Sequence, residues 1–401
     1  MTEKYNFSAA HAALQRHVDS PILPGVSTAI IKNGQLIDSF CTGFADIERG
    51  EALRPDHIHR AYSCTKLMTS VLVMLLVDQG HFALDDAVKK WIPAFGQLRV
   101  LRTGATSLDD TMPLEHDITI RHLLSHQAGF SHGVFDPGTL IYSAYAAAGV
   151  RKPDSTLEQL MNQMAALPLI YQPGTNWQYS MATDVVGRLA EIVTGQTMAE
   201  AFKTRLFEPL GMVDTAYLLR EDQIPRLATL YAGHPMNAIK SGLHSLENMP
   251  WPEAFIKPVP RQAASSGLVT TQADMLALLS QLLPGHGNLL KQETLFEMLR
   301  DQLPAHRSVQ FAQSGQMHIP DGASPSLGFS LCGAVTRTNS NFQPNTPVRE
   351  VQWGGLAGPH WWISPATGTA GVLMTQRFMG FWNPFWFEYK QHMYAALEEA
   401  A

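Results

Sequence analysis

The stretch AYSCTKLMTSVLVMLLVDQG, residues 61–80, places a single lysine at the start of a long apolar run. From Lys66 to Val77 apolar residues occupy every face of a helix, which predicts a helix buried on all sides and ended by Gly80. An ammonium group at the start of such a helix needs either a partner or a chemical role. The residues around Lys66 decide between these two interpretations.

Ser63, Cys64, Thr65 and Lys66 form an S-x-x-K motif. Residues at i and i+3 share one face of a helix, so the Lys66 amine can reach the Ser63 hydroxyl. The positive end of the helix dipole and desolvation both disfavour the ammonium form at this position. A neutral amine could accept the serine proton and generate a nucleophile. A capping serine beside a snorkelling lysine is the alternative, and the motif alone leaves both open.

A second serine motif, GFSHG at residues 129–133, fits the G-x-S-x-G nucleophile elbow. That elbow needs a strand before the serine and a helix after it. Here the preceding residues have helical spacing, and a turn at residues 136–138 follows. The context therefore disfavours Ser131 as a nucleophile.

Three histidines, His122, His126 and His132, raise the alternative of a zinc site, because helical histidines at i and i+4 can bind zinc. The glutamate of an H-E-x-x-H motif is missing, since Leu123 and Leu124 follow His122. We therefore expect packing histidines and no metal.

Tyr179 lies after a Pro-Gly turn and directly before a segment with helical spacing. A phenol held near Lys66 could carry a proton to a leaving group. A tyrosine with a solvated hydroxyl is the alternative. Further along, Gly354 and Gly355 would let the backbone approach a ligand closely, and an N–H there could join that of Ser63 to bind an oxyanion.

The order of the predicted elements indicates an α/β (α+β) fold. Asn33-Gly34 joins two strand-like runs into a hairpin, and strand-like segments return near the C-terminus before a last amphipathic helix. Helical patterns fill most of the region between them, including the segment LDDAVKKWIPAF. We predict an antiparallel sheet domain from residues 1–82 and 225–401, flanked by helices, with a helical domain inserted at 83–224.

Composition excludes several classes of protein. The chain has 401 residues, 45% of them hydrophobic and 16% charged, and a formal net charge of −6 without basic runs, which argues against a nucleic-acid partner. The longest apolar stretch is far shorter than the roughly 20 residues that span a bilayer, so no membrane association is expected. The first residues have no apolar signal-peptide core, which predicts a cytoplasmic protein.

Together these segments resemble, over nearly the whole chain, the serine hydrolases of the class C β-lactamase and penicillin-binding superfamily. The segments that carry the likeness are GVSTAIIKNGQLI, HRAYSCTK, TIRHLLSHQAGF, LIYQPGTNWQYS, LFEPLGM and SSGLVTTQADM. Within the superfamily the likeness is closest to the family VIII carboxylesterases. The resemblance implies a β-lactamase/transpeptidase-like fold.

The resemblance also implies roles for individual residues. It makes Ser63 the acylated nucleophile, Lys66 its activating partner and Tyr179 the general base and acid. The third motif of the family corresponds to the W-G-G of residues 353–355, where substrate would bind. The backbone N–H of Leu356 would then complete the oxyanion hole with that of Ser63.

Two departures from the β-lactamase pattern bear on the substrate. Met181 stands where the Y-x-N motif has its asparagine, and Trp353 stands where K-T-G has its lysine. Both changes replace polar recognition by apolar surface and favour neutral esters. The resemblance thus implies a serine carboxylesterase for small, short-chain esters, without a cofactor. An acyltransferase, or a β-lactamase or penicillin-binding protein with weak β-lactam turnover, is the alternative.

Aromatic residues near the third motif are candidates for the acyl pocket, although packing on the sheet is the favoured interpretation for most of them: Trp353, Trp361, Trp362, Phe378 and Trp382. His360 lies close to the same motif. Packing is favoured for it as well, with a role in positioning substrate as the alternative.

Overall fold

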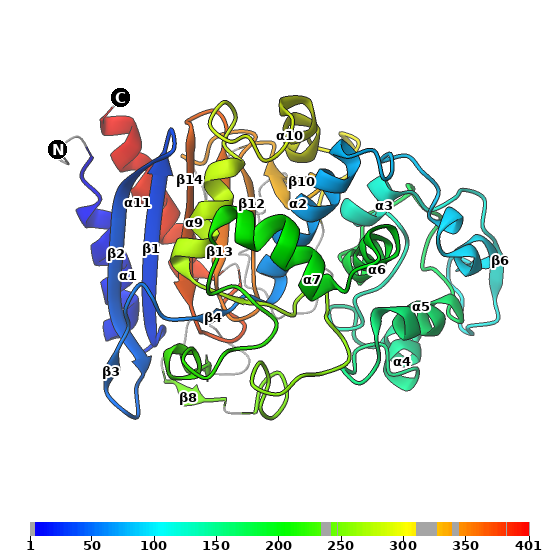
Figure 1. The fold of residues 1–401 in the computed structure, drawn as a ribbon, viewed down its shortest axis with the longest axis horizontal. Coiled ribbons are helices and arrows are strands. Elements are labelled where there is room, and N and C mark those ends of the chain that lie inside the picture. Colours follow the sequence, from blue (N-terminus) through cyan, green and yellow to red (C-terminus); the bar gives the residue numbers. More distant parts are fainter. Residues whose placement is uncertain are drawn as a thin grey trace.

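The computed structural model describes residues 5–233, 242–246, 248–309, 327–338, 345–381 and 383–400. Its main feature is an eight-stranded sheet with the order β10-β11-β12-β13-β14-β1-β2-β3, in which every neighbouring pair is antiparallel (Figure 1). Its strands are β1 (Gly25–Lys32), β2 (Gln35–Asp46), β3 (Glu51–Ala52), β10 (Leu327–Phe329), β11 (Ala334–Thr336), β12 (Val351–Gly354), β13 (His360–Ser364) and β14 (Thr369–Thr375).

The predicted hairpin joins β1 to β2. Asn33 and Gly34 have φ angles of 48° and 75°, and positive values at both positions suit a two-residue hairpin turn. On its other side β1 pairs with β14, with Val26 opposite Thr375. The sheet is therefore completed by strands from both ends of the chain, which confirms that prediction.

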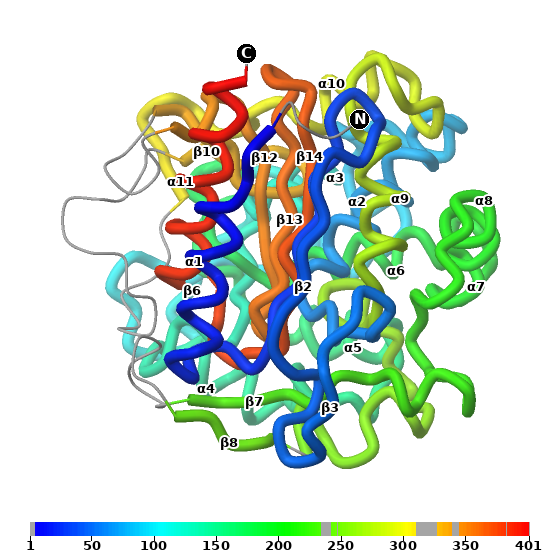
Figure 2. The backbone as a smooth tube through the Cα atoms, turned by 90° about the vertical axis from the view of Figure 1, so that its left-hand side faces the viewer, coloured from blue at the N-terminus to red at the C-terminus, as the bar shows by residue number. Residues whose placement is uncertain are grey.

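Helices cover both faces of the sheet. Helices α1 (Ser8–Asp19) and α11 (Pro384–Glu399) pack against each other across one face (Figure 2). Glu388 of α11 accepts hydrogen bonds from Arg16 and His17 of α1. Helix α9 (Gln272–Gln281) packs on β1 and β14 from the opposite face (Figure 1).

Helix α2 (Thr65–Asp78) is the buried helix that the apolar run predicts. All its residues from Thr65 to Leu76 are buried, and Gly80, with a φ of 78°, follows its C-terminal end. The helix lies between the sheet and the helices at the other side of the molecule, and it contacts α6 (Ala182–Thr194) (Figure 1). A short 3₁₀ turn, η1 (Tyr62–Cys64), leads directly into it.

The region between α2 and α9 holds short helices joined by long loops. The pattern LDDAVKKWIPAF forms only the 3₁₀ turns η2 (Val88–Lys90) and η3 (Pro93–Gln97), so the prediction of a helix there is wrong. Pro93 has no N–H to donate, so a helix cannot run unbroken through it, and it instead begins η3. The division of the chain at residues 82 and 225 stays a prediction.

The other elements complete the chain between and beyond these. The helices are α3 (Ile120–Leu124), α4 (Leu140–Ala147), α5 (Leu157–Ala165), α7 (Met198–Phe202), α8 (Glu208–Leu210) and α10 (Gln292–Leu299), with the single turns η4 (Lys203–Phe207) and η5 (Ile224–Arg226). Three small antiparallel pairs join β4 (His59–Arg60) to β9 (Val269–Thr270), β5 (Arg99–Leu101) to β6 (Thr111–Pro113), and β7 (Tyr231–Ala232) to β8 (His244–Ser245). Within the described ranges, every helix is too short or too polar to cross a membrane.

Candidate active site

Ser63 lies in η1, at the N-terminal end of the buried helix α2. Its side chain is partly exposed and lines a cavity of about 1060 Å³. The residue before it, Tyr62, has a φ of 44°, which is unusual for a side chain of this size. Strained backbone of this kind is concentrated at functional sites.

Lys66 and Tyr179 both converge on the Ser63 hydroxyl. The Tyr179 hydroxyl lies 2.8 Å from Ser63 Oγ, and Lys66 Nζ lies 3.4 Å from it. The ammonium nitrogen also lies 4.7 Å from the centroid of the Tyr179 ring. The structure thus brings together the three side chains that the sequence singles out, from segments more than 100 residues apart.

Lys66 is also anchored by a part of the chain that sequence reasoning missed. Its Nζ donates a 2.8 Å hydrogen bond to the carbonyl oxygen of Ser265. The Ser265 hydroxyl and N–H in turn donate to the two carboxylate oxygens of Asp184, at 2.5 and 3.1 Å. Burial raises the pKa of Asp184, while the Ser265 bond and the Lys66 charge oppose that shift. This arrangement fixes the amine against the serine.

The Tyr179 ring is enclosed by aromatic side chains. His132 stacks on it at 5.1 Å between centroids, and His126 and Trp353 lie at 4.8 and 5.2 Å. Burial, together with the charge of Lys66, lowers the pKa of both histidines well below the ordinary value. The two imidazoles are therefore neutral, and the indole N–H of Trp353 donates to the Tyr179 oxygen at 3.4 Å.

The end of β12 presses on η1 through Gly355. A β-carbon on this residue would lie 2.3 Å from the carbonyl oxygen of Ala61, so only glycine permits the approach. The contact places Leu356 on the cavity wall, where Ser63 also lies. The described residues that line the cavity do not include Trp353, Gly354 or Gly355, which support the site from behind.

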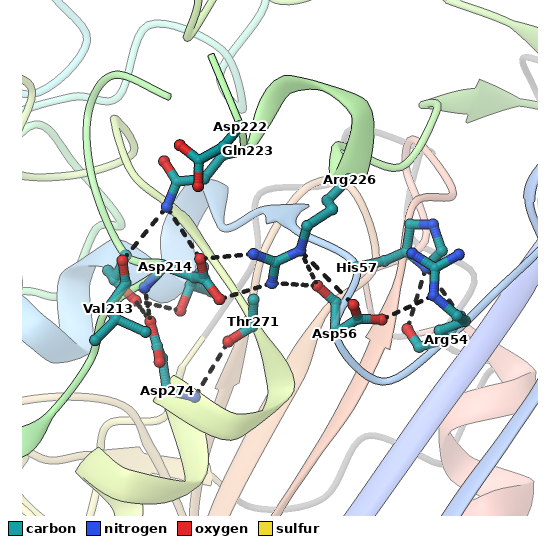
Figure 3. A network of polar contacts seen from close by, with 12 residues as sticks. Arg54, Asp56, His57, Val213, Asp214, Asp222, Gln223, Arg226, Thr271 and Asp274 are labelled. Carbon is teal, nitrogen blue, oxygen red and sulfur yellow. Dashed lines mark hydrogen bonds and ion pairs between the residues drawn. The ribbon is translucent and has the colours of Figure 1, made fainter. Parts of the chain in front are cut away.

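A network of polar contacts fixes another wall of the cavity (Figure 3). Arg226 donates to both carboxylate oxygens of Asp214, at 2.9 and 2.7 Å, and to the carbonyl oxygen of Asp56 at 2.6 Å. Asp274, in the first turn of α9, accepts from the Asp214 N–H and from the hydroxyl of the cavity residue Thr215. The network therefore holds the cavity wall against α9 and the segment before β4.

Comparison with protein families identifies the family to which the chain belongs. The model of the family described as Beta-lactamase matches residues 10–383. The chain belongs to the Beta-lactamase family. It is accordingly an enzyme of the serine-hydrolase type, and the expected superfamily and its α+β fold are confirmed.

Similar members of the Beta-lactamase family include proteins named esterases. Esterase EstB of Burkholderia gladioli is 27% identical over 93% of this chain and 91% of its own length. Lovastatin esterase of Penicillium rubens is 28% identical over 89% of this chain and 90% of its own. A solved structure of "EstCE1, a hydrolase with promiscuous acyltransferase activity" covers 96% of this chain and 98% of its own, with 24% identity and a TM-score of 0.79.

Ser131, the competing serine of this Beta-lactamase family member, is fully buried. Its hydroxyl donates a 2.5 Å hydrogen bond to Asp136 and accepts one from the Gly133 N–H at 2.9 Å. These bonds close a tight loop on the serine itself. Ser131 therefore has a structural role in its loop, which agrees with a sequence context that disfavours it as a nucleophile.

The three histidines considered as metal ligands have separate packing roles. His122 caps α3, His126 bonds the Ser180 hydroxyl at 3.1 Å, and His132 stacks on Tyr179. Across the part of the chain that the structure describes, His, Cys, Asp and Glu side chains form no group of three or more suited to a metal ion.

Most of the aromatic candidates for the acyl pocket pack on the sheet instead. Trp361 and Trp362 are fully buried in β13. Phe378 instead belongs to a small hydrophobic cluster that includes the cavity residues Tyr62 and Leu356. Trp382 lies outside the described residues. His360 is buried and stacks on Trp386 at 4.4 Å between centroids, so it has a packing role rather than one in positioning substrate.

Proposed function

We propose that this member of the Beta-lactamase family is a serine carboxylesterase that cleaves short-chain carboxylic esters through an acyl-enzyme on Ser63. The observation that carries the proposal is the position of the Ser63 hydroxyl between the Tyr179 hydroxyl, at 2.8 Å, and the Lys66 amine, at 3.4 Å. Both distances allow a proton to leave the serine as it attacks. The partly exposed serine on a large cavity gives an ester access to it.

In the first half-reaction Ser63 Oγ attacks the carbonyl carbon of the ester. Its proton passes to the pair formed by Lys66 and Tyr179, and the carbonyl π electrons move onto the oxygen. The backbone N–H groups of Ser63 and Leu356 would hold that oxyanion. Collapse of the intermediate breaks the bond to the alcohol oxygen, which takes a proton from Tyr179. The alcohol leaves and the acyl group stays on Ser63.

In the second half-reaction water takes the place of the alcohol. Tyr179 accepts a proton from the attacking water, whose oxygen bonds to the acyl carbon. When the second intermediate collapses, the bond to Ser63 Oγ breaks and the serine recovers its proton from Tyr179. The products are a carboxylic acid and the free enzyme.

The lining of the cavity supports neutral acyl groups. The lining includes Met181, Phe135 and Leu356, all apolar. Met181 and Trp353 replace the amide and the ammonium that the β-lactamase pattern provides for polar parts of a substrate. Efficient β-lactam turnover is therefore disfavoured, and small neutral esters remain the better substrates.

The test is hydrolysis of p-nitrophenyl butyrate by the wild type, Ser63→Ala and Ser131→Ala, with intact-mass detection of the acyl adduct. We expect Ser63→Ala to lose both turnover and adduct, and Ser131→Ala to keep both. Loss of activity in Ser131→Ala alone, or equal activity in all three proteins, would overturn the mechanism.

Acyl transfer is a second candidate function. A cavity of about 1060 Å³ is at the upper end of the range for small-molecule sites, so it can hold an acceptor alcohol beside the acylated serine. EstCE1, the structural relative, is described as having both hydrolase and acyltransferase activity. Adding primary alcohols to the butyrate assay and quantifying the new butyrate ester separates the two functions. An acyltransferase would form that ester faster than butyric acid.

A further inference from the structure

The charges around the cavity are strongly biased toward cations. Among the described residues that line it, Glu208 is the one carboxylate. Five cationic side chains line the same cavity: Arg151, Lys203, Arg220, Lys257 and Arg261. This bias contrasts with the formal net charge of −6 for the whole chain. Cationic walls attract anionic ligands when their charge is not already compensated.

Four of the five cations are already occupied by protein groups. Three pair with carboxylates: Lys203 with Glu208 at 3.7 Å, Arg220 with Asp222 at 3.1 Å and Lys257 with Glu253 at 2.6 Å. Arg261 is buried and donates to the carbonyl oxygens of Val150 and Ser155 and to the Ser155 hydroxyl. These guanidinium and ammonium groups therefore have structural or surface partners.

Arg151 differs from the other four. It is exposed, its guanidinium lies 5.1 Å from the centroid of the Tyr142 ring, and within the described residues it forms no ion pair with a carboxylate. The aromatic contact restrains the side chain without using its hydrogen-bond donors. The guanidinium thus keeps its donors free to bind a ligand in the cavity.

Arg151 is also close to the side of the catalytic centre formed by Tyr179. Its Cδ lies 3.5 Å from the position that a β-carbon on Gly133 would take. The neighbouring His132 stacks on Tyr179, and its pKa is lowered by burial and, to a smaller extent, by the charges of Lys66 and Arg151. In the proposed function Tyr179 protonates the leaving alcohol, so an ester bound in that way would present its alcohol portion to the side of the cavity that holds His132 and Arg151.

We propose that Arg151 binds a carboxylate on the alcohol portion of the substrate, so that the enzyme prefers esters of hydroxy acids over the matching neutral esters. The proposal rests on the proposed esterase function. The acyl side stays apolar, as Met181 and Leu356 require, and the anion is placed on the opposite side of the scissile bond. A guanidinium suits this role because its planar donors match a carboxylate.

The test uses two butyrate esters that differ in one charge. These are 4-butyryloxybenzoate, whose leaving group carries a carboxylate, and its methyl ester, which is neutral. The quantity measured is the ratio of kcat/KM for the anionic ester to kcat/KM for the neutral one, in the wild type, Arg151→Gln, Arg151→Lys and Lys152→Gln. Lys152 is the matched control, because it is the adjacent exposed cation and is absent from the described lining of the cavity.

We expect Arg151→Gln to lower the ratio by about five- to tenfold, mainly through KM, as loss of a partly exposed charged hydrogen bond implies. Arg151→Lys should keep part of the preference, Lys152→Gln should keep all of it, and raising the salt to about 0.5 M should weaken it in the wild type. An unchanged ratio in Arg151→Gln, or an equal fall in Lys152→Gln, would overturn the proposal. Absence of hydrolysis of the neutral ester would instead overturn the esterase function itself.

Discussion

Two buried lysines, Lys66 and Lys390, differ in the groups that surround them. Lys66 lies beside the hydroxyl of Ser63, and Lys390 forms an ion pair in the core. The side chains of both are shielded from solvent, with exposed residue fractions of 4% and 0%. Lys390 of α11 forms an ion pair with the buried Glu350, which also accepts a hydrogen bond from Tyr394. Lys66 instead contacts a carbonyl oxygen, a hydroxyl and an aromatic ring.

The difference lies in how directly a carboxylate reaches each amine. Desolvation lowers the pKa of Lys390 to about 8 and raises the pKa of Glu350, and the direct ion pair holds the two groups together inside the protein. Asp184 acts on Lys66 only across Ser265. A direct ion pair would occupy the Lys66 amine, whereas the hydrogen bond to a carbonyl oxygen leaves the amine beside Ser63, where the proposed mechanism needs it.

The strongest test of this comparison is Lys66→Met, which keeps the volume of the side chain and removes its amine. We expect kcat for p-nitrophenyl butyrate to fall by about 10³-fold or more, because the serine loses its activating partner. Thermal unfolding monitored by circular dichroism should show that the variant is folded. A fall smaller than about tenfold would mean that Tyr179 alone activates the serine.

The corresponding change at the other site is Lys390→Met, which leaves Glu350 buried without its partner. The free energy of unfolding should fall by about 3 kcal/mol, because an unpaired buried charge is costly. Urea denaturation measures this loss, and kcat per folded molecule should stay near that of the wild type. Adding Glu350→Gln should restore much of the stability. A double variant as unstable as the single one would show that packing, and not charge, dominates.

Local patterns were enough to predict the elements that carry Ser63, the proposed nucleophile. The apolar run after Lys66 predicted the buried helix α2, and Asn33-Gly34 predicted the hairpin, because both signals are contained in neighbouring residues. The S-x-x-K spacing placed the Lys66 amine near the serine for the same reason. The meeting with Tyr179, 116 residues away, needed the resemblance to a family as well.

Long-range contacts explain what could not be predicted. The link from Asp184 to Ser265 joins residues 81 positions apart, and its one local signal is an acidic residue on the buried face of α6. Among the described residues, the lack of an ion pair at Arg151 depends on which cations lie beside carboxylates in the folded chain. The apolar character of Trp361 and Trp362 fits a cavity wall as well as a sheet interior, so only the structure distinguishes the two.

A smaller effect is expected at His360, whose pKa is lowered to about 3 by burial and by the charge of Lys390, against the opposing bond to the Gly358 carbonyl oxygen. In the unfolded chain the same group titrates near 6.5, so the unfolded state binds the proton first as the pH falls. The contribution of the neutral His360 side chain to the free energy of unfolding is therefore complete above about pH 6.5. It is lost progressively as the pH falls from about 6.5 to about 3.

The variant His360→Gln tests that linkage. It should reduce the slope of the unfolding free energy against pH between about 6 and 4 by about 1.4 kcal/mol per pH unit. Urea denaturation at several pH values measures the slope. Above about pH 7.5 the free energies of unfolding of the wild type and the variant should differ by a constant amount. Parallel curves across the whole range would show that His360 is protonated in the folded protein.

The smallest effect is expected at Trp353, which holds Tyr179 from behind through a 3.4 Å hydrogen bond. Trp353→Phe keeps the aromatic packing and removes the donor, so kcat should fall about threefold with little change in KM, as for a weak positioning contact. Trp361→Phe is the matched control, because Trp361 pairs with Trp353 across the sheet while its indole N–H has no partner among the described residues. A change in KM alone would place Trp353 in contact with substrate, and equal effects in both variants would assign the loss to the sheet instead of to Tyr179.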